Sequence, residues 1–89
     1  MTVAPGFPAS SKMALPARRC VFQQGDGTGG SEEYLGHAST EAQCHAMVTA
    51  QRPSANGATV SPGGGSCYAE FGMNGDNNSG WWRTCQFIQ

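Results

Sequence analysis

The chain has 89 residues, of which 12% are charged, and its formal net charge is −1 at pH 7. This length allows one domain at most, and no apolar run approaches the roughly 20 residues that a transmembrane helix requires. Positions 20–89 hold all six acidic residues, two arginines and no lysine. We therefore expect no nucleic-acid partner, because few cations are present to replace the counterions of phosphates. The lack of a long apolar run leads us to expect no membrane insertion.

The first 18 residues differ in composition from the rest. They contain three of the five prolines and no acidic residue, and they show no helical or strand periodicity. We therefore expect residues 1–18 to form a flexible tail and residues 19–89 to form a single domain. The tail lacks the apolar region of a secretory signal peptide. We expect the chain to be a piece excised from a larger secreted or cell-surface protein.

The domain is predicted to begin with two short strands. Residues 19–24 favour a strand in which Cys20 and Phe22 share one face. Four of the six residues in 25–30 are glycine, and this composition favours a loop. A second short strand is predicted over residues 33–36. These two strands would form a hairpin with a long tip.

The clearest helix signal begins at Thr40. Thr40 and Gln43 have the spacing of a capping box, in which a hydroxyl and an amide side chain satisfy backbone N–H groups at the helix start. A helix is predicted from about residue 41 to about residue 51, and Pro53 would end it. Its inward stripe consists of Cys44, Met47 and Val48.

The clearest strand lies over residues 65–72, where two sets of side chains alternate. Its inward face would carry Cys67, Ala69 and Phe71, and its outward face Tyr68 and Glu70. A proline–glycine loop joins it to a strand over 58–61, and this arrangement is typical of a hairpin.

The chain is predicted to end with a polar loop over 72–80 and a strand over 81–88. Trp81 would face the core with Cys85, whereas Trp82 would be at least partly exposed. The alternative for Trp82 is that it covers a second small core or the tail. The predicted fold class is α+β, with one helix packed on a small antiparallel sheet of four or five strands.

The four cysteines are spread almost evenly along the domain. An even number in a short chain with a thin core is typical of disulfides and an oxidising compartment. The expected location is therefore extracellular, either secreted or on the cell surface. Three pairings are possible, and side-chain geometry decides among them. We favour Cys20–Cys85, which would join the ends of the domain, and Cys44–Cys67, which would tie the helix to the central strand.

The order of these features resembles the PAN/apple superfamily. A cysteine in the first strand is followed by the helix start Ser39–Cys44, the short strand 57–60 and the segment Ser66–Phe71. The resemblance covers residues 20–88. It implies one helix on a small antiparallel sheet, with disulfides from helix to central strand and often from first strand to last. It also implies a non-catalytic extracellular module that binds proteins or carbohydrates. Many members have a second helix cysteine where this chain has Val48.

We predict no enzymatic activity, no cofactor and no metal centre. If all four cysteines form disulfides, no thiol is left as a nucleophile. Neither His37 nor His45 has a serine or carboxylate partner in a motif, and the cysteine spacings match no zinc site. Calcium stays an alternative partner, because the loops offer oxygen ligands. These ligands are Asp26, Glu32, Glu33, Asp76, Asn77, Asn78 and Ser79.

The predicted binding site centres on Trp82, because an exposed aromatic side chain beside a polar loop suits contact with a sugar or a protein. Its members are Tyr68, Glu70, Asn74, Asp76, Asn77, Asn78 and Trp82. The alternative for Tyr68 and Glu70 is an ordinary solvated sheet face.

The predicted function is non-catalytic recognition of an extracellular protein or glycan. Two alternatives remain. The chain could be a self-associating building block of an extracellular matrix or adhesive, or a small secreted effector or toxin-like protein.

Overall fold

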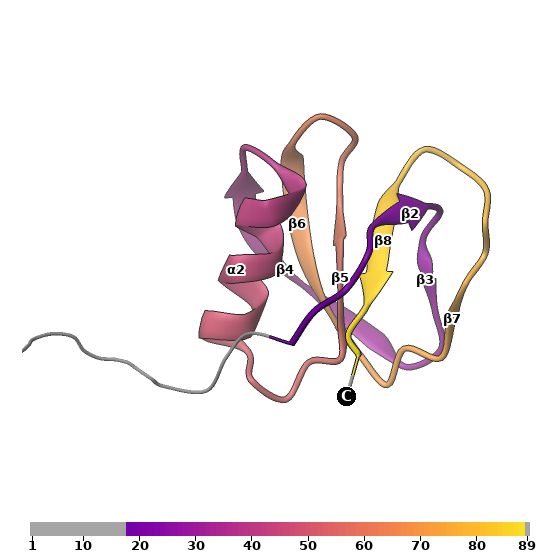
Figure 1. The fold of residues 1–89 in the computed structure, drawn as a ribbon, viewed down its shortest axis with the longest axis horizontal. Coiled ribbons are helices and arrows are strands. Elements are labelled where there is room, and N and C mark those ends of the chain that lie inside the picture. The colour runs from indigo at the N-terminus through magenta and orange to yellow at the C-terminus, as the bar shows by residue number, and fades with distance from the viewer. Residues whose placement is uncertain (1–17, 89) are drawn as a thin grey trace, which may run out of the picture.

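The computed structural model describes residues 18–88. Within them, one helix packs on a five-stranded antiparallel sheet, and a two-stranded sheet lies beside it (Figure 1). This architecture confirms the predicted fold class. No helix of this part is both long and apolar enough to cross a membrane. The elements are β2 (Gln23–Gln24), β3 (Gly27–Thr28), β4 (Ser31–Ala38), α2 (Glu41–Gln51), β5 (Gly57–Val60), β6 (Gly65–Phe71), β7 (Gly75–Asp76) and β8 (Arg83–Gln86).

The tail predicted over residues 1–18 lies outside the described residues, except for Arg18. This residue packs on the domain. Its guanidinium donates to the carbonyl groups of Pro53 and Ala55 and lies 5.2 Å from the ring centroid of Phe87. Arg18 therefore belongs to the packed domain.

The main sheet has the strand order β2-β8-β5-β6-β4, and every neighbouring pair is antiparallel. The predicted hairpin of β5 and β6 is confirmed. The predicted hairpin of the first two strands is wrong, because β2 pairs with β8 and β4 pairs with β6. Between β2 and β4, the glycine-rich segment 25–30 carries the chain from one edge of the sheet to the other and forms β3 on the way.

The length of each strand is set by the strand with which it pairs rather than by the alternation of side chains in its own sequence. β4 has eight residues instead of the predicted four, because it pairs along the whole of β6. The first strand shortens to Gln23–Gln24, since only these residues pair with β8. The last strand begins at Arg83 rather than at residue 81.

Helix α2 has the predicted bounds. Thr40 is the N-cap, and its hydroxyl accepts a hydrogen bond from the backbone N–H of Gln43 at 3.0 Å. The side chain of Gln43 accepts from the backbone N–H of Ser39, one residue before the cap. Cys44 and Val48 are fully buried, and Met47 is partly buried against the same core. The predicted inward stripe is therefore confirmed.

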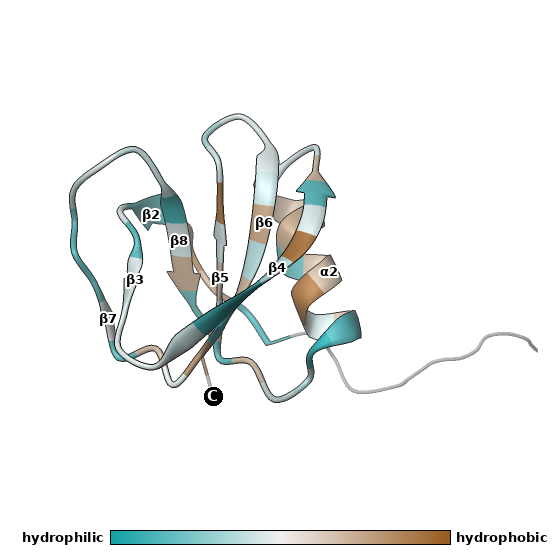
Figure 2. Ribbon diagram, turned by 180° about the vertical axis from the view of Figure 1, so that it is seen from behind, coloured by the Kyte–Doolittle hydropathy of each residue, from teal (hydrophilic) through white to brown (hydrophobic). Residues whose placement is uncertain are grey.

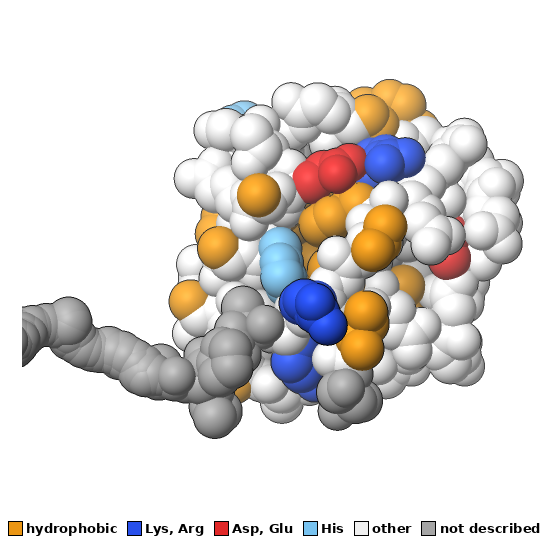
Figure 3. Space-filling view, in the orientation of Figure 1, with side chains coloured by type: hydrophobic (Ala, Val, Ile, Leu, Met, Phe, Trp, Pro, Cys, Tyr) orange, Lys and Arg blue, Asp and Glu red, His pale blue; other side chains and the backbone are white. Residues whose placement is uncertain are grey.

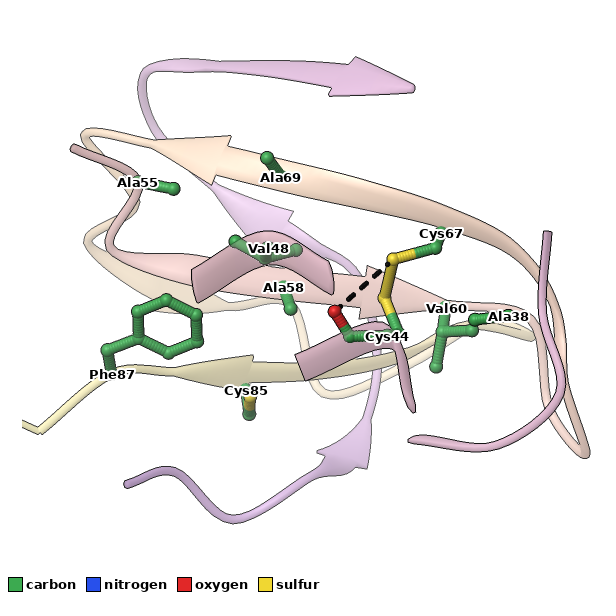
Figure 4. Packing of buried hydrophobic residues seen from close by; sticks show 10 residues of the cluster. All are labelled: Ala38, Cys44, Val48, Ala55, Ala58, Val60, Cys67, Ala69, Cys85 and Phe87. Atoms are coloured by element: carbon green, nitrogen blue, oxygen red, sulfur yellow. Dashed lines mark hydrogen bonds between the residues drawn. A yellow bond between two sulfur atoms is a disulfide. The ribbon is translucent and has the colours of Figure 1, made fainter. Parts of the chain in front are cut away.

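The core lies between α2 and the sheet and consists mostly of small side chains (Figure 4). Two disulfides cross it. The Cα atoms of Cys20 and Cys85 are 5.4 Å apart, and those of Cys44 and Cys67 are 5.5 Å apart. Both predicted pairings are confirmed. The buried members of the core are Ala38, Cys44, Val48, Ala55, Ala58, Val60, Cys67, Ala69, Cys85 and Phe87.

The sheet face away from the helix is partly covered by the small sheet of β3 and β7. β3 contacts β5 and β8, and β7 contacts β8. Seen from this side, the small sheet and the first half of β4 are mostly hydrophilic (Figure 2). A Cβ atom built at Gly27 would lie 3.0–3.2 Å from the carboxyl group of Glu70. The prediction that Glu70 is exposed is therefore wrong: Glu70 is only 2% exposed, because β3 lies over it.

Candidate binding site: an aromatic strip beside three carboxyl groups

Four aromatic rings form a continuous row, which we call the aromatic strip. Tyr34 of β4 lies 5.4 Å from Tyr68 of β6, measured between ring centroids. Tyr68 lies 5.7 Å from Trp82, and Trp82 lies 5.1 Å from Trp81. Neighbouring rings are tilted by 58°, 87° and 73°. Such tilted and edge-to-face contacts are the arrangement that aromatic pairs prefer.

The strand register explains why these rings meet. Tyr34 lies opposite Tyr68 in the β4–β6 pair, and Tyr68 lies opposite Thr59 in the β6–β5 pair. Trp82 directly precedes β8, on the other side of β5, and its carbonyl accepts a hydrogen bond from the N–H of Gly25 at 2.7 Å. β5 lies between β6 and β8, and the side chain that it presents beside Tyr68 is the short Thr59. The large Trp82 ring can therefore reach Tyr68 across β5.

The two ends of the strip are exposed. Tyr34 is 56% exposed and Trp81 is 62% exposed, whereas Tyr68 and Trp82 are half-buried. The prediction that Trp81 is buried is wrong, because Trp81 lies in a bend before β8 and the strand alternation does not extend to it. The prediction that Trp82 is partly exposed is confirmed. The strip therefore has an exposed ring at each end and two half-buried rings between them, and a ligand can contact this surface.

Three carboxyl groups lie beside the strip, and we call them the carboxyl cluster. Oxygen atoms of Asp26, Glu32 and Glu70 all lie within 4.8 Å of one another. Glu32 and Glu70 are opposite each other in the β4–β6 pair. Each stands two residues from a tyrosine of the strip, and side chains two apart share a face of a strand. The cluster and the strip therefore belong to the same face of the sheet.

Burial makes Glu70 unusual among these acids. Its Oε2 atom accepts a hydrogen bond from the hydroxyl of Thr59 at 2.6 Å. The pKa of Glu70 is raised from 4.5 to about 7, mainly by burial and also by the nearby carboxyl groups of Glu32 and Asp26, while the hydrogen bond from Thr59 opposes the rise. Glu70 is thus poised to carry a proton near neutral pH, so fewer than three charges need to share this small space.

The cluster also bears on the calcium alternative. Three close carboxyl groups could hold a hard cation such as Ca²⁺ or could share a proton. Of the other oxygen ligands expected from the sequence, Glu33 belongs to the helix side, where it pairs with Arg52 at 2.6 Å. The hydrogen bond from Arg52 lowers the pKa of the Glu33 carboxyl. The expected ligand set therefore does not converge on one point.

The polar side chains in the loop part of the predicted site form hydrogen bonds within the domain. Asn74 accepts from Thr28 at 3.3 Å, and the side-chain oxygen of Asn77 accepts from the N–H of Asp26 at 3.1 Å. The Oδ1 atom of Asp76 accepts from the N–H of Asn78 at 2.8 Å. These side chains stabilise the loop and its contact with residues 26–28. Of the predicted site, the structure brings Tyr68 and Trp82 together.

Sequence reasoning missed both exposed ends of the strip. Tyr34 could have been found once the pairing of β4 with β6 was known, because it then faces Tyr68. No local signal marks Trp81, since its exposure depends on where β8 begins.

Two clefts lie around the exposed side chains of Val21 and Ile88, where Ile88 follows β8 and Trp82 precedes it. One has a volume of about 350 Å³ and the other about 330 Å³. The first is lined by Val21, Gln23, Met73, Gly75, Asp76, Thr84, Cys85, Gln86 and Ile88. Neither cleft includes a residue of the aromatic strip. The strip is therefore a separate surface.

Comparison with known proteins gave no match, whether with protein-family models, with curated proteins or with solved structures.

Proposed function

We propose that this chain is a non-catalytic recognition module that binds a protein or a carbohydrate through the aromatic strip. One observation carries the proposal: four rings are in contact on a sheet face that the helix does not cover, and the rings at both ends are more than half exposed. Exposed aromatic side chains provide large contact areas at little cost in conformational entropy. Tyrosine and tryptophan are also enriched at the energetic centres of interfaces.

The proposal includes an extracellular location. Two disulfides and the lack of a membrane-spanning helix among residues 18–88 are compatible with it. Disulfides persist mainly in oxidising compartments. The order of the elements and the helix-to-strand disulfide also support the PAN/apple-like character that the sequence suggests, as a domain of a larger secreted or cell-surface protein.

The absence of catalysis is part of the proposal. All four cysteines are held in disulfides, which removes the thiol nucleophile of a cysteine–histidine pair. The ring of His45 packs against Phe87, with 5.2 Å between centroids, and this contact gives His45 a structural role.

Screening of a glycan array and a random-peptide display library would test the proposal. The decisive variant is the double substitution Tyr34→Ser and Trp81→Ser, which removes both exposed ends of the strip. Its matched control is Val21→Ser with Ile88→Ser, because these side chains are 70% and 56% exposed but line clefts that contain no residue of the strip.

We expect ligands that bind the wild type and the control but not the strip variant. The proposal fails if neither library yields a ligand whose binding depends on the strip. Melting temperatures of both variants, measured in parallel, show whether any loss of binding comes from unfolding.

A further inference from the structure

We propose that the aromatic strip and the carboxyl cluster bind a cationic segment of a partner protein, a peptide stretch that carries arginine or lysine. This inference rests on the proposed function and names the class of its ligand. Four steps support it: the distribution of charge, the accessibility of Glu32, the exposure of the neighbouring ring and the tilt of the rings.

The described arginines gather on the helix side and at its edge. Arg52 pairs with Glu33 at 2.6 Å, and Arg83 pairs with Glu41 of α2 at 2.8 Å. Arg18 stacks over Phe87. Figure 3, drawn in the orientation of Figure 1, shows basic side chains together with a histidine on this face. The two acids on this side, Glu33 and Glu41, are therefore already paired.

The opposite face has the reverse charge. Asp26, Glu32 and Glu70 meet there, and among residues 18–88 none of them forms an ion pair. Glu32 is exposed, so its charge is available to a ligand. Glu70 is only 2% exposed, so the acids that a ligand meets on this face are Glu32 and Asp26. A protein face with acids and no paired base attracts a positively charged partner and repels a negatively charged one. The complementary partner is therefore cationic.

The aromatic strip provides a second interaction that favours a cationic ligand. A guanidinium or ammonium group is attracted to the face of an aromatic ring. Tyr34 is 56% exposed and stands two residues from Glu32 on the same face of β4. One cationic side chain can therefore contact the ring of Tyr34 and the carboxylate of Glu32 together.

The tilt of the rings argues against a flat polysaccharide as the preferred ligand. Angles of 58°, 87° and 73° between neighbouring rings leave no common plane on which successive sugars could stack. A peptide can instead place separate side chains at Tyr34 and at Trp81, with its backbone over the half-buried rings between them. The geometry therefore favours a peptide over a flat glycan chain.

Titration of isotope-labelled protein with short capped peptides, followed by amide chemical shifts, tests this inference. In the first peptide arginine alternates with glycine. In the second, citrulline replaces arginine and keeps the shape without the charge, and in the third, glutamate replaces it. Each titration is run at about 20 mM and about 150 mM salt, because exposed charge pairs are screened at the higher concentration.

Variants of β4 distinguish the contributions of side chains on its two faces. Glu32→Gln removes a charge from the cluster face, and Glu33→Gln removes the same charge from the helix side. Tyr34→Leu removes the ring but keeps an apolar side chain. We expect the arginine peptide to shift resonances of Glu32, Tyr34 and Tyr68. Glu32→Gln should weaken its binding about two- to fivefold, and Glu33→Gln should leave it unchanged. Tyr34→Leu should weaken it by a similar factor.

Several results would overturn the inference. The citrulline peptide could bind as tightly as the arginine peptide, or the shifts could map to α2. Glu33→Gln could weaken binding as much as Glu32→Gln does.

If the protein alone shows concentration-dependent shifts at the strip, the occupant is a second copy rather than a partner peptide. If the libraries yield strip-dependent ligands but the arginine peptide does not bind, the ligand class is wrong and the recognition function stands. If both fail, the proposed function fails too.

Discussion

The hydroxyl oxygen of Thr59 lies 2.6 Å from Oε2 of Glu70, and both side chains are buried in the main sheet. The same hydroxyl lies 2.7 Å from the hydroxyl of Thr84, which donates to the carbonyl of Ala58 at 3.1 Å. The hydroxyl of Thr59 donates to Oε2 of Glu70, so the row of hydroxyl groups ends at this carboxyl group. Burial and the nearby carboxyl groups of Glu32 and Asp26 outweigh this hydrogen bond and raise the pKa of Glu70 to about 7. The carboxyl group is therefore protonated in the folded protein below about pH 7.

The protonation of Glu70 should make the protein less stable as pH rises. Burial, with Glu32 and Asp26, raises the pKa of Glu70 from 4.5 to about 7, so the folded state keeps a proton that the unfolded chain releases between these values. The contribution of this proton to the free energy of unfolding is fully present below pH 4.5. It falls by up to about 3 kcal/mol as the pH rises to about 7, and it changes little above that pH. Below about pH 5, protonation of Glu33, whose pKa Arg52 lowers, acts in the opposite direction. Maximum stability should lie near pH 5.

Denaturant unfolding of the wild type and Glu70→Gln at about pH 5 and about pH 8 measures this effect. The amide oxygen of glutamine can accept the hydrogen bond from Thr59, and the amide does not titrate, so the variant should be more stable than the wild type at pH 8 and should show a flatter pH dependence. EDTA in every sample removes any contribution from a cation held by the carboxyl cluster. A wild type and a variant with the same pH dependence would show that Glu70 does not hold the proton.

The N-cap of α2 gives a second, local prediction. Thr40→Ala removes the acceptor for the N–H of Gln43 and should lower the free energy of unfolding by about 1 kcal/mol, whereas Thr40→Ser should keep most of it. The matched control is Thr49→Ala, because the hydroxyl of Thr49 only donates to the carbonyl of Ala46 inside the helix. Thermal unfolding of the three variants is the measurement. Equal losses for Thr40→Ala and Thr49→Ala would contradict the role of the cap.

The features that the sequence predicted well are those determined by neighbours in the chain. The capping residues and Pro53 set the bounds of α2, and the turn before Gly65 joins β5 to β6. The partners of β2 and β4 could not be predicted in this way. β2 pairs with a strand sixty residues away in the sequence, at Thr84 and Arg83. Such pairing is decided by the packed core and by loop closure, and neither leaves a local pattern.

The candidate site shows the same division. Tyr68 and Trp82 were predicted from alternation along single strands, and the structure brings them into contact. Glu70 follows the same alternation and points to the same face, but β3 covers it. Alternation therefore identifies the face of a side chain, whereas its exposure depends on what else the chain places over that face.

Both disulfides should be present in the native protein and should contribute unequally to its stability. Closing loops of 23 and 65 residues is worth about 3 and about 4 kcal/mol in the chain-entropy model. Replacing Cys20 and Cys85 with serine should therefore cost about 4 kcal/mol. Replacing Cys44 and Cys67 should cost at least about 3 kcal/mol, since these side chains are also fully buried. Mass spectrometry without reductant should show two hydrogens fewer for each disulfide, and four free thiols would contradict the pairing.

The turn before β4 gives the last prediction, because it tests how closely the chain approaches β6. Gly30 has φ +65°, and a Cβ atom there would lie 1.7 Å from the carbonyl oxygen of Phe71. Gly63 has a similar φ of +75° but would place its Cβ in open space. Gly63→Ala should therefore cost only the backbone strain of about 1 kcal/mol, whereas Gly30→Ala must also displace β4 or β6 and should cost more than about 2 kcal/mol. Denaturant unfolding compares the two variants. Equal costs would mean that the turn does not press against β6. A larger cost at Gly30, together with weaker ligand binding at Tyr34 and Tyr68, would show that this contact positions the aromatic strip.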